Sequence, residues 1–210
     1  MATIAKAHNL IPKVSKNVAS IHIDHVDQTD ESDLNLLSRL ATDNDAIVTV
    51  KAGHLLLFKS GQATTVSGQP IPTITLTRAN GDQHRYNIVE REGGYTGVKA
   101  YWNDKQGARR TEVMIGKVGK LKVLRKTYRT EAQAKSAANA ELNRTKRNGA
   151  TFSLTMALGR PDITPETPIK LNGWKVEIDK HSWLVTKATH SLSSGLTTVL
   201  DLETFLAAIK

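Results

Sequence analysis

Residues 150–203 read ATFSLTMALGRPDITPETPIKLNGWKVEIDKHSWLVTKATHSLSSGLTTVLDLE, and this stretch decides the fold. Apolar and polar side chains alternate at its start, which is the period-two pattern of a β-strand with one buried face. Gly159, Pro161 and the turn pair Asn172-Gly173 interrupt the pattern. Further strands are expected at residues 174–178, 182–190 and 196–203. The stretch therefore predicts an antiparallel sheet.

The sheet is expected to continue upstream and to enclose one helix. Asn80-Gly81 suits a tight turn between strands at residues 73–77 and 83–89. More strands are expected at residues 95–102, 111–115 and 121–128. Residues 130–148 predict a helix that begins with a capping pattern and carries a stripe of small side chains: Ala134, Ala137, Ala138 and Leu142. Many short strands at regular spacing favour a small antiparallel β-barrel packed around this helix.

Residues 1–60 predict a smaller α+β subdomain. A short helix at residues 4–10 and a strand at 20–26 precede a helix capped by Thr29 or Asp30. The apolar stripe of that helix is Leu34, Leu37 and Ala41. Ala52-Gly53 suits a two-residue turn between strands at 46–51 and 54–59, and residues 60–72 have the composition of a linker. The expected fold class is α+β and predominantly β: a small α+β subdomain (1–60), then an antiparallel β-barrel domain with one packed helix (61–210).

Composition excludes several classes of protein. The absence of cysteine excludes disulfides and thiolate chemistry, and no apolar run reaches the roughly 20 residues that span a bilayer. The start of the chain lacks the pattern of a secretory signal. A net charge of +9 is typical of proteins that bind nucleic acids, because Lys and Arg neutralise phosphates. Aromatic residues are only 5%, however, and we expect the basic residues to be scattered, so this class is disfavoured.

The most ligand-like cluster is His22, Asp24, His25 and Asp27. Imidazole and carboxylate suit zinc or another transition metal. On a strand, however, the first two side chains would share one face and the last two would point to the other. The alternative is a polar strand end that leads into a helix cap, and it is favoured; no metal or other cofactor is assigned.

Two carboxylate pairs, Glu90 with Glu92 and Asp162 with Glu166, could in principle serve glycoside hydrolysis. Such pairs are common in turns and at strand edges, which is the favoured interpretation. The histidines of the expected strands lack partners at a catalytic spacing: His54, His84, His181 and His190. No residue is therefore assigned to catalysis.

Glycine pairs and basic residues have equally ordinary interpretations. Gly93-Gly94 and the pair Gly116 and Gly119 do not follow the strand-to-helix pattern of phosphate loops, so we expect them in turns. The basic stretch 117–129 could contact DNA, but its alternation favours a strand with one solvated face.

The chain resembles the phage late control protein D family, the tail hub proteins of contractile phages. The motifs that carry this resemblance are Gly159-Arg160-Pro161-Asp162-Ile163, Pro168, Gly173, Ile178-Asp179, Trp183 with Val185, Thr189-His190, and Gly195 through Leu202-Glu203. Upstream motifs are Asp27-Gln28, Glu31-Ser32-Asp33, residues 53–61 and Gly94-Tyr95-Thr96-Gly97-Val98. The resemblance therefore covers nearly the whole chain.

The resemblance implies a mechanical role in the baseplate, inside the virion. Members of the family are similar to the core of type VI secretion spike proteins, in which two barrel domains form a trimeric ring. Such a ring joins a hexameric tail tube to a trimeric central spike. The expected partners are copies of the hub itself, the tail spike protein, and tail tube and baseplate wedge proteins, with no membrane. No interface residue is assigned.

This chain departs from the family pattern in two ways. The first barrel is expected to be absent, and a Lys-rich insertion between the strands near Trp102 and Thr111 is reduced to a short turn. The leading hypothesis is thus a non-enzymatic baseplate hub protein. The alternatives are a basic nucleic-acid-binding module of prophage origin and a cell-wall hydrolase.

Overall fold

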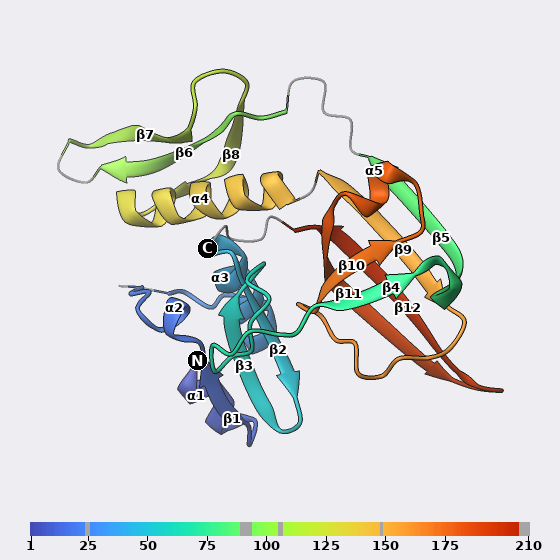
Figure 1. Ribbon diagram of the computed structural model, residues 1–210. Coiled ribbons are helices and arrows are strands. Elements are labelled where there is room, and N and C mark those ends of the chain that lie inside the picture. Colours follow the sequence, from blue (N-terminus) through green and yellow to red (C-terminus); the bar gives the residue numbers. More distant parts are fainter. Residues whose placement is uncertain (24–25, 89–93, 105–106, 148, 206–210) are drawn as a thin grey trace. The chain divides into compact units, whose positions relative to one another are not determined.

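The computed structural model describes residues 1–23, 26–88, 94–104, 107–147 and 149–205 (Figure 1). The chain forms two compact units, and each is discontinuous in sequence. The first unit comprises residues 1–60, 66–68 and 91–145, and the second comprises 61–65, 69–90 and 146–210. These bounds differ from the expected domains of residues 1–60 and 61–210, because a segment that we expected in the barrel belongs to the first unit.

The first unit begins with a small three-stranded sheet and short helices. Its elements are α1 (Ala2–Ala7), β1 (Ile11–Val14), α2 (Lys16–Ala19), α3 (Asp33–Asp43), β2 (Ala46–Lys51) and β3 (His54–Lys59). The strand order is β1-β3-β2, with β1 parallel to β3 and β2 antiparallel to it. The predicted turn is confirmed, since Ala52 and Gly53 have φ angles of 48° and 72°. The α+β character of this part is also confirmed.

Two details of this region were predicted wrongly. The described residues at 20–23 and 26 form no strand, because β1 occupies the free edge of β3. Helix α3 is capped by Ser32 rather than by Thr29 or Asp30: the Ser32 hydroxyl accepts a hydrogen bond from the Asn35 amide at 3.2 Å. The predicted stripe also differs in one residue: Leu34 is 53% exposed, and the helix buries Leu36 beside Leu37.

The second part of the first unit is a three-stranded sheet covered by one helix. It consists of β6 (Gly97–Asp104), β7 (Arg109–Gly116), β8 (Leu121–Tyr128) and α4 (Glu131–Arg147), with strand order β7-β6-β8. The predicted cap of α4 is present, because the Thr130 hydroxyl accepts a hydrogen bond from the Gln133 amide. The alanine stripe packs against Val98, Ala100 and Tyr128. The predicted helix is thus confirmed, but it packs on this sheet and is not enclosed by a barrel.

The second unit is a six-stranded sheet. Its strands are β4 (Ile74–Thr77), β5 (Gly81–Ile88), β9 (Ala150–Met156), β10 (Pro168–Asn172), β11 (Ser182–Leu192) and β12 (Leu196–Thr204). The order is β4-β10-β11-β12-β9-β5, and only the β4–β10 pair is parallel. The core is rich in large side chains, including Phe152, Trp183 and Leu200. Within the described part of the chain, β4 and β5 are not paired, so a closed barrel is not confirmed.

The expected hairpin at Asn80-Gly81 is wrong. Residues Arg78–Asn80 form a turn of 3₁₀ helix, stabilised by the Asn80 side chain, which accepts a hydrogen bond from the Thr77 amide at 2.7 Å. This turn sends β4 and β5 to opposite edges of the sheet. Gly81 is needed for a different reason, since a Cβ there would lie 2.4 Å from the Leu154 side chain on β9. The strand expected at residues 174–178 is also absent, and a short helix, α5 (Val176–Asp179), takes its place.

Candidate functional site

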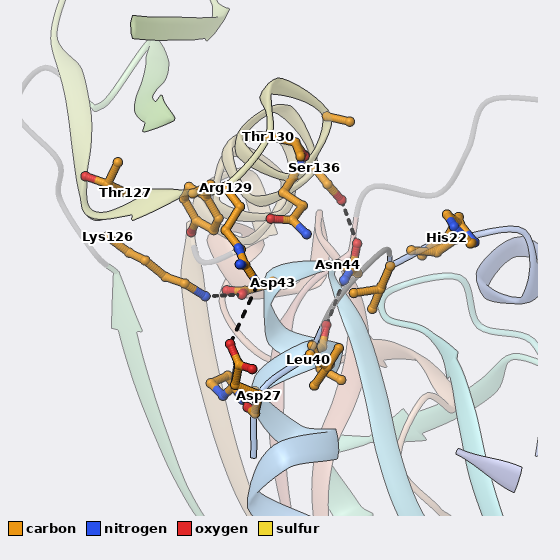
Figure 2. Close-up of a pocket in the computed structure, with 17 residues that line it drawn as sticks. His22, Asp27, Leu40, Asp43, Asn44, Lys126, Thr127, Arg129, Thr130 and Ser136 are labelled. Carbon is orange, nitrogen blue, oxygen red and sulfur yellow. Dashed lines mark hydrogen bonds and ion pairs between the residues drawn. The ribbon is translucent and has the colours of Figure 1, made fainter. Parts of the chain in front are cut away.

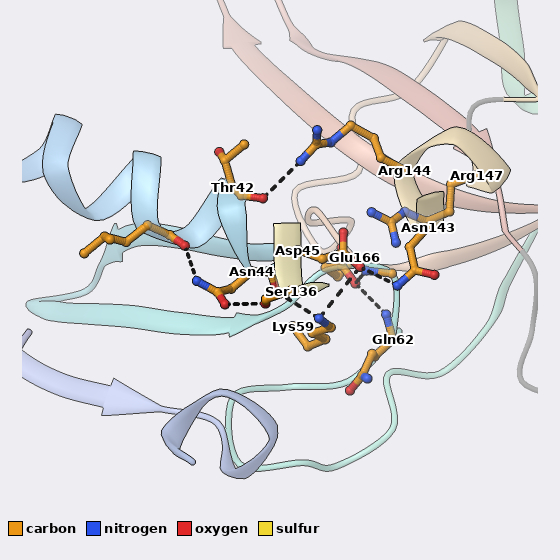
Figure 3. Close-up of polar contacts among 12 residues, drawn as sticks. Thr42, Asn44, Asp45, Lys59, Gln62, Ser136, Asn143, Arg144, Arg147 and Glu166 are labelled. Carbon is orange, nitrogen blue, oxygen red and sulfur yellow. Dashed lines mark hydrogen bonds and ion pairs between the residues drawn. The ribbon is translucent and has the colours of Figure 1, made fainter. Parts of the chain in front are cut away.

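A pocket of about 360 Å³ lies in the first unit, where α3 and the start of α4 approach β8 (Figure 2). Three hydrogen bonds join the end of α3 and the following residues to α4. Ser136 donates to the Asn44 side-chain oxygen at 2.7 Å, Asn143 donates to Asp45 at 3.3 Å, and Arg144 donates to the Thr42 carbonyl (Figure 3). These hydrogen bonds fix the end of α3 against α4 beside the pocket, and two of the bonded residues, Asn44 and Ser136, line it.

Two ion pairs join charged groups that line this pocket, and a further lining residue, Arg39, pairs with Glu31 outside it. Lys126 lies 2.6 Å from Asp43, and Arg129 lies 3.7 Å from Asp27 (Figure 2). The buried phenol of Tyr128 completes one side, and burial raises the pKa of Tyr128 to about 12. A phenol with this pKa stays protonated at neutral pH, so it does not provide a base. The pocket thus offers hydrogen-bonding groups and solvent-exposed ion pairs rather than an activated acid, base or nucleophile.

The possible metal ligands come together only in part. His22 and Asp27 both line the pocket, but Asp24 and His25 lie outside the described residues. The Asp27 carboxylate faces Arg129, and its backbone carbonyl accepts a hydrogen bond from Arg39 at 3.1 Å. Among the residues that the structure describes, no group of three or more His, Asp or Glu side chains could hold a metal ion.

The carboxylates considered for hydrolysis have structural partners. Glu90 and Glu92 lie outside the described residues. Asp162 accepts two hydrogen bonds from Arg160, at 2.8 and 2.7 Å, and these bonds hold the pKa of Asp162 below its usual value. Glu166 has a separate set of partners in the protein interior. The two groups are therefore each occupied by a contact that stabilises the fold.

Glu166 anchors the loop that follows β3. Its carboxylate accepts hydrogen bonds from the backbone amides of Gly61 (3.0 and 3.1 Å), Gln62 (3.2 Å) and Ala63 (3.4 Å), and Gln62 and Glu166 face each other in Figure 3. Burial raises the pKa of Glu166, while the three amides and Arg147 act in the opposite direction. Residues 61–65 therefore belong to the packed second unit and are not the linker that their composition suggests.

The glycines and histidines of the sequence hypotheses have ordinary structural roles. Gly119, with a φ angle of 151°, lies in the turn between β7 and β8 as predicted, whereas Gly116, with a φ angle of 100°, is the last residue of β7. His84 stacks on Phe152, and His181 lies edge-on to Trp183 at 5.8 Å, where burial lowers the pKa of His181. His190 contacts the Thr198 hydroxyl at 3.0 Å. His54 contacts the Ala52 carbonyl at 2.7 Å.

Sequence reasoning missed one surface. The basic residues are not scattered, because residues 97–129 contain ten Lys and Arg but only two Asp and Glu, whereas the rest of the chain contains 19 and 18. This segment is the sheet β7-β6-β8 with its turns. A count of charge in successive windows of the sequence would have found it. Strand β8 itself was predicted correctly.

Comparison with known proteins identifies the family. Residues 1–196 match the family model described as phage tail baseplate hub (GPD). The chain belongs to this family. Its members are components of the tail baseplate of phage particles.

Two curated relatives and one solved structure illustrate the match. Probable baseplate hub proteins of Escherichia phages 186 and P2 are each 38% identical, over 252 and 248 residues that cover 100% and 99% of this chain. The chain covers 64% of each relative, so it spans less than two thirds of their length. The crystal structure of a tail protein from Neisseria meningitidis MC58 shares the fold, with a TM-score of 0.60 and 16% identity over 97% of this chain and 63% of that one.

The aligned stretch of the phage 186 protein is longer than this chain of 210 residues, so that relative contains residues without a counterpart here. In the part of the chain that the structure describes, no helix has the length and apolar character needed to cross a bilayer.

Proposed function

We propose that this chain is the part of a baseplate hub that connects the tail tube to the central spike, as one subunit of a trimeric ring. The observation that carries this proposal is the family match over residues 1–196 together with the α+β fold. The role is mechanical and involves no catalysis. It is consistent with a pocket whose charged groups lie in ion pairs.

Exposed strand edges and apolar side chains support an assembly role. Strands β4 and β5 each have only one hydrogen-bonded neighbour among the described strands. Such edges can be completed by a strand from another chain. Leu158, Val176 and Leu192 on the second unit are 77–82% exposed, and large apolar side chains at this exposure are suited to protein contacts. The hub, spike and tube proteins are the partners proposed for these surfaces.

The second unit is proposed to form a barrel in the assembled particle. Its six strands follow an order in which β4 and β5 stand at the two edges, so pairing of these strands would close the sheet. The hydroxyl of Tyr86 on β5 already contacts the Glu177 carbonyl of α5 at 3.4 Å. Helix α5 follows β10, the neighbour of β4, so this hydrogen bond from the Tyr86 hydroxyl to the Glu177 backbone carbonyl links β5 to the segment after β10.

Deletion of the gene from the phage or prophage that carries it tests the proposal. We expect particles made without the gene to lack assembled baseplates under negative-stain electron microscopy, because the tube and spike have no connecting ring. Full-length protein supplied from a plasmid should restore both baseplates and infectivity. Normal baseplates in the absence of the gene would refute the hub assignment, and a monomeric full-length protein in isolated baseplates would refute the trimer.

A further inference from the structure

We infer that the sheet β7-β6-β8 binds the phosphate backbone of double-stranded DNA. The first observation is its charge: residues 97–129 carry ten basic and two acidic residues, in a chain whose net charge is +9. The surplus of the whole chain is therefore concentrated in one sheet. Like charges that are crowded together repel and destabilise a fold, so this concentration calls for an anionic ligand that offsets the repulsion.

The second observation is the orientation of the sheet. One face packs against α4 through Val98, Ala100 and Tyr128. On the opposite face, the exposed alternate residues of β7 are Arg110, Glu112, Met114 and Gly116. Strand β8 adds the exposed Arg125. The turn between β7 and β8 adds the exposed Lys117 and Lys120. Exposed cations therefore lie near both ends of β7, at Arg110 and at the turn that follows the strand, while Glu112 and Met114 lie between them.

The third observation is which of these charges are already neutralised. Five of them pair with acids of the first unit: Lys99 with Glu112, Arg109 with Asp104, Lys122 with Glu141, Lys126 with Asp43, and Arg129 with Asp27. Within the described residues, by contrast, no acid pairs with Arg110, Lys117 or Arg125. Arg110 lies instead 3.8 Å above the ring of Tyr101, which holds its guanidinium on the outer face. These cations are available to an external anion.

The dimensions suit a duplex. Eight residues of extended strand in β7 span about 26 Å, a length along which B-DNA presents roughly 15 phosphates. An acidic protein is the competing ligand. Lysine, however, is depleted in the cores of protein interfaces, whereas phosphates are neutralised by lysine and arginine alike. Six of the ten cations are lysines, so the composition favours DNA.

The experiment measures binding of the 210-residue chain to a fluorescein-labelled duplex of about 20 base pairs by fluorescence anisotropy. With three phosphate contacts, from Arg110, Lys117 and Arg125, affinity should fall about 40-fold between about 50 and 200 mM salt. The triple variant Arg110→Gln, Lys117→Gln and Arg125→Gln should reduce the log–log salt slope by about three and the affinity at low salt by at least about tenfold.

The matched control removes the same charge from exposed positions of the second unit: Lys170→Gln, Lys175→Gln and Lys187→Gln. We expect it to bind DNA like the unmodified chain, with both variants showing unchanged circular dichroism and thermal unfolding. Three results would overturn the inference: no binding at low salt, equal loss of binding in the control, or competition by polyglutamate as effective as that by unlabelled duplex. The inference does not depend on the hub assignment.

Discussion

The six-stranded sheet of the second unit buries Trp183 and Phe152 almost completely, whereas the three-stranded sheet of the first unit packs Val98 and Ala100 against alanines of α4. Large aromatic side chains each remove about 150–250 Å² from water, so a few residues stabilise the larger sheet. Alanine instead lets a helix approach a sheet closely. The core beneath α4 therefore depends on small side chains, and the core of the second unit depends on large ones. Larger side chains should destabilise the former, and smaller side chains should destabilise the latter.

Removal of a large buried side chain from the second unit is expected to have the largest effect on stability. Trp183 is fully buried, and its indole nitrogen donates to the Ile178 carbonyl at 3.0 Å. Trp183→Ala should lower the free energy of unfolding by about 3–5 kcal/mol, measured by urea denaturation. The control Leu192→Ala, at a position 82% exposed, should change it by less than about 0.5 kcal/mol. Equal effects of the two substitutions would contradict the assignment of the core.

Replacement of a small buried side chain in the first unit by a larger one should have the next largest effect on stability. Ala138 has no exposed surface on the sheet-facing side of α4. Ala138→Leu should therefore destabilise the chain by about 1–3 kcal/mol, because the helix must move away from β6. The matched control, Ala132→Leu at an exposed position of the same helix, should be nearly neutral. Thermal unfolding of both variants checks this, and a well-tolerated leucine at 138 would show that the helix packs loosely.

The smallest expected effect is the pH dependence that Glu166 of the second unit gives to the stability of the chain. Burial raises the pKa of Glu166 in the folded second unit above its usual value of 4.5. The contribution of Glu166 to stability is therefore full below about pH 4.5 and is lost as the pH rises through the folded-state pKa. Glu166→Gln removes this dependence.

Urea denaturation of the unmodified chain and of Glu166→Gln between acidic and neutral pH measures the difference. The stability of the unmodified chain relative to the variant should decrease as the pH rises. A relative stability that increases with pH would show that the amides of residues 61–63 outweigh burial and that the pKa is lowered instead. The control variant is Asp162→Asn, which alters an exposed carboxylate in the same loop, and its stability is measured over the same range of pH.

Local patterns in the sequence predicted most helices and strands correctly, but they did not predict which strands pair with each other. The alternation at residues 150–156, the alanine stripe of α4 and the turn at Ala52-Gly53 all report on neighbours close in the chain, and all three are confirmed. The hairpin at Asn80-Gly81 was wrong because the Asn80 side chain bonds to the Thr77 backbone and closes a different turn. The partner of β4, namely β10, is far away in the sequence and leaves no local signal.

The candidate site was less predictable than the fold. The cluster of His and Asp residues from His22 to Asp27 suggested a metal site, but the Asp27 carboxylate forms an ion pair with Arg129, which is distant in the sequence. The three amides that surround Glu166 are backbone groups, which no pattern of side chains reveals. The basic sheet, by contrast, could be found from composition alone, provided that the charge is counted locally and not over the whole chain.

The pairing of β5 with β9 has a consequence for synthesis on the ribosome. Every residue of β6, β7, β8 and α4 lies between these two adjacent strands in the chain. Strands β4 and β5 therefore emerge early and stay without their neighbours until translation has passed α4. The intervening segment can form its own local contacts during that delay, and extra residues within it lengthen the wait at only a small entropic cost.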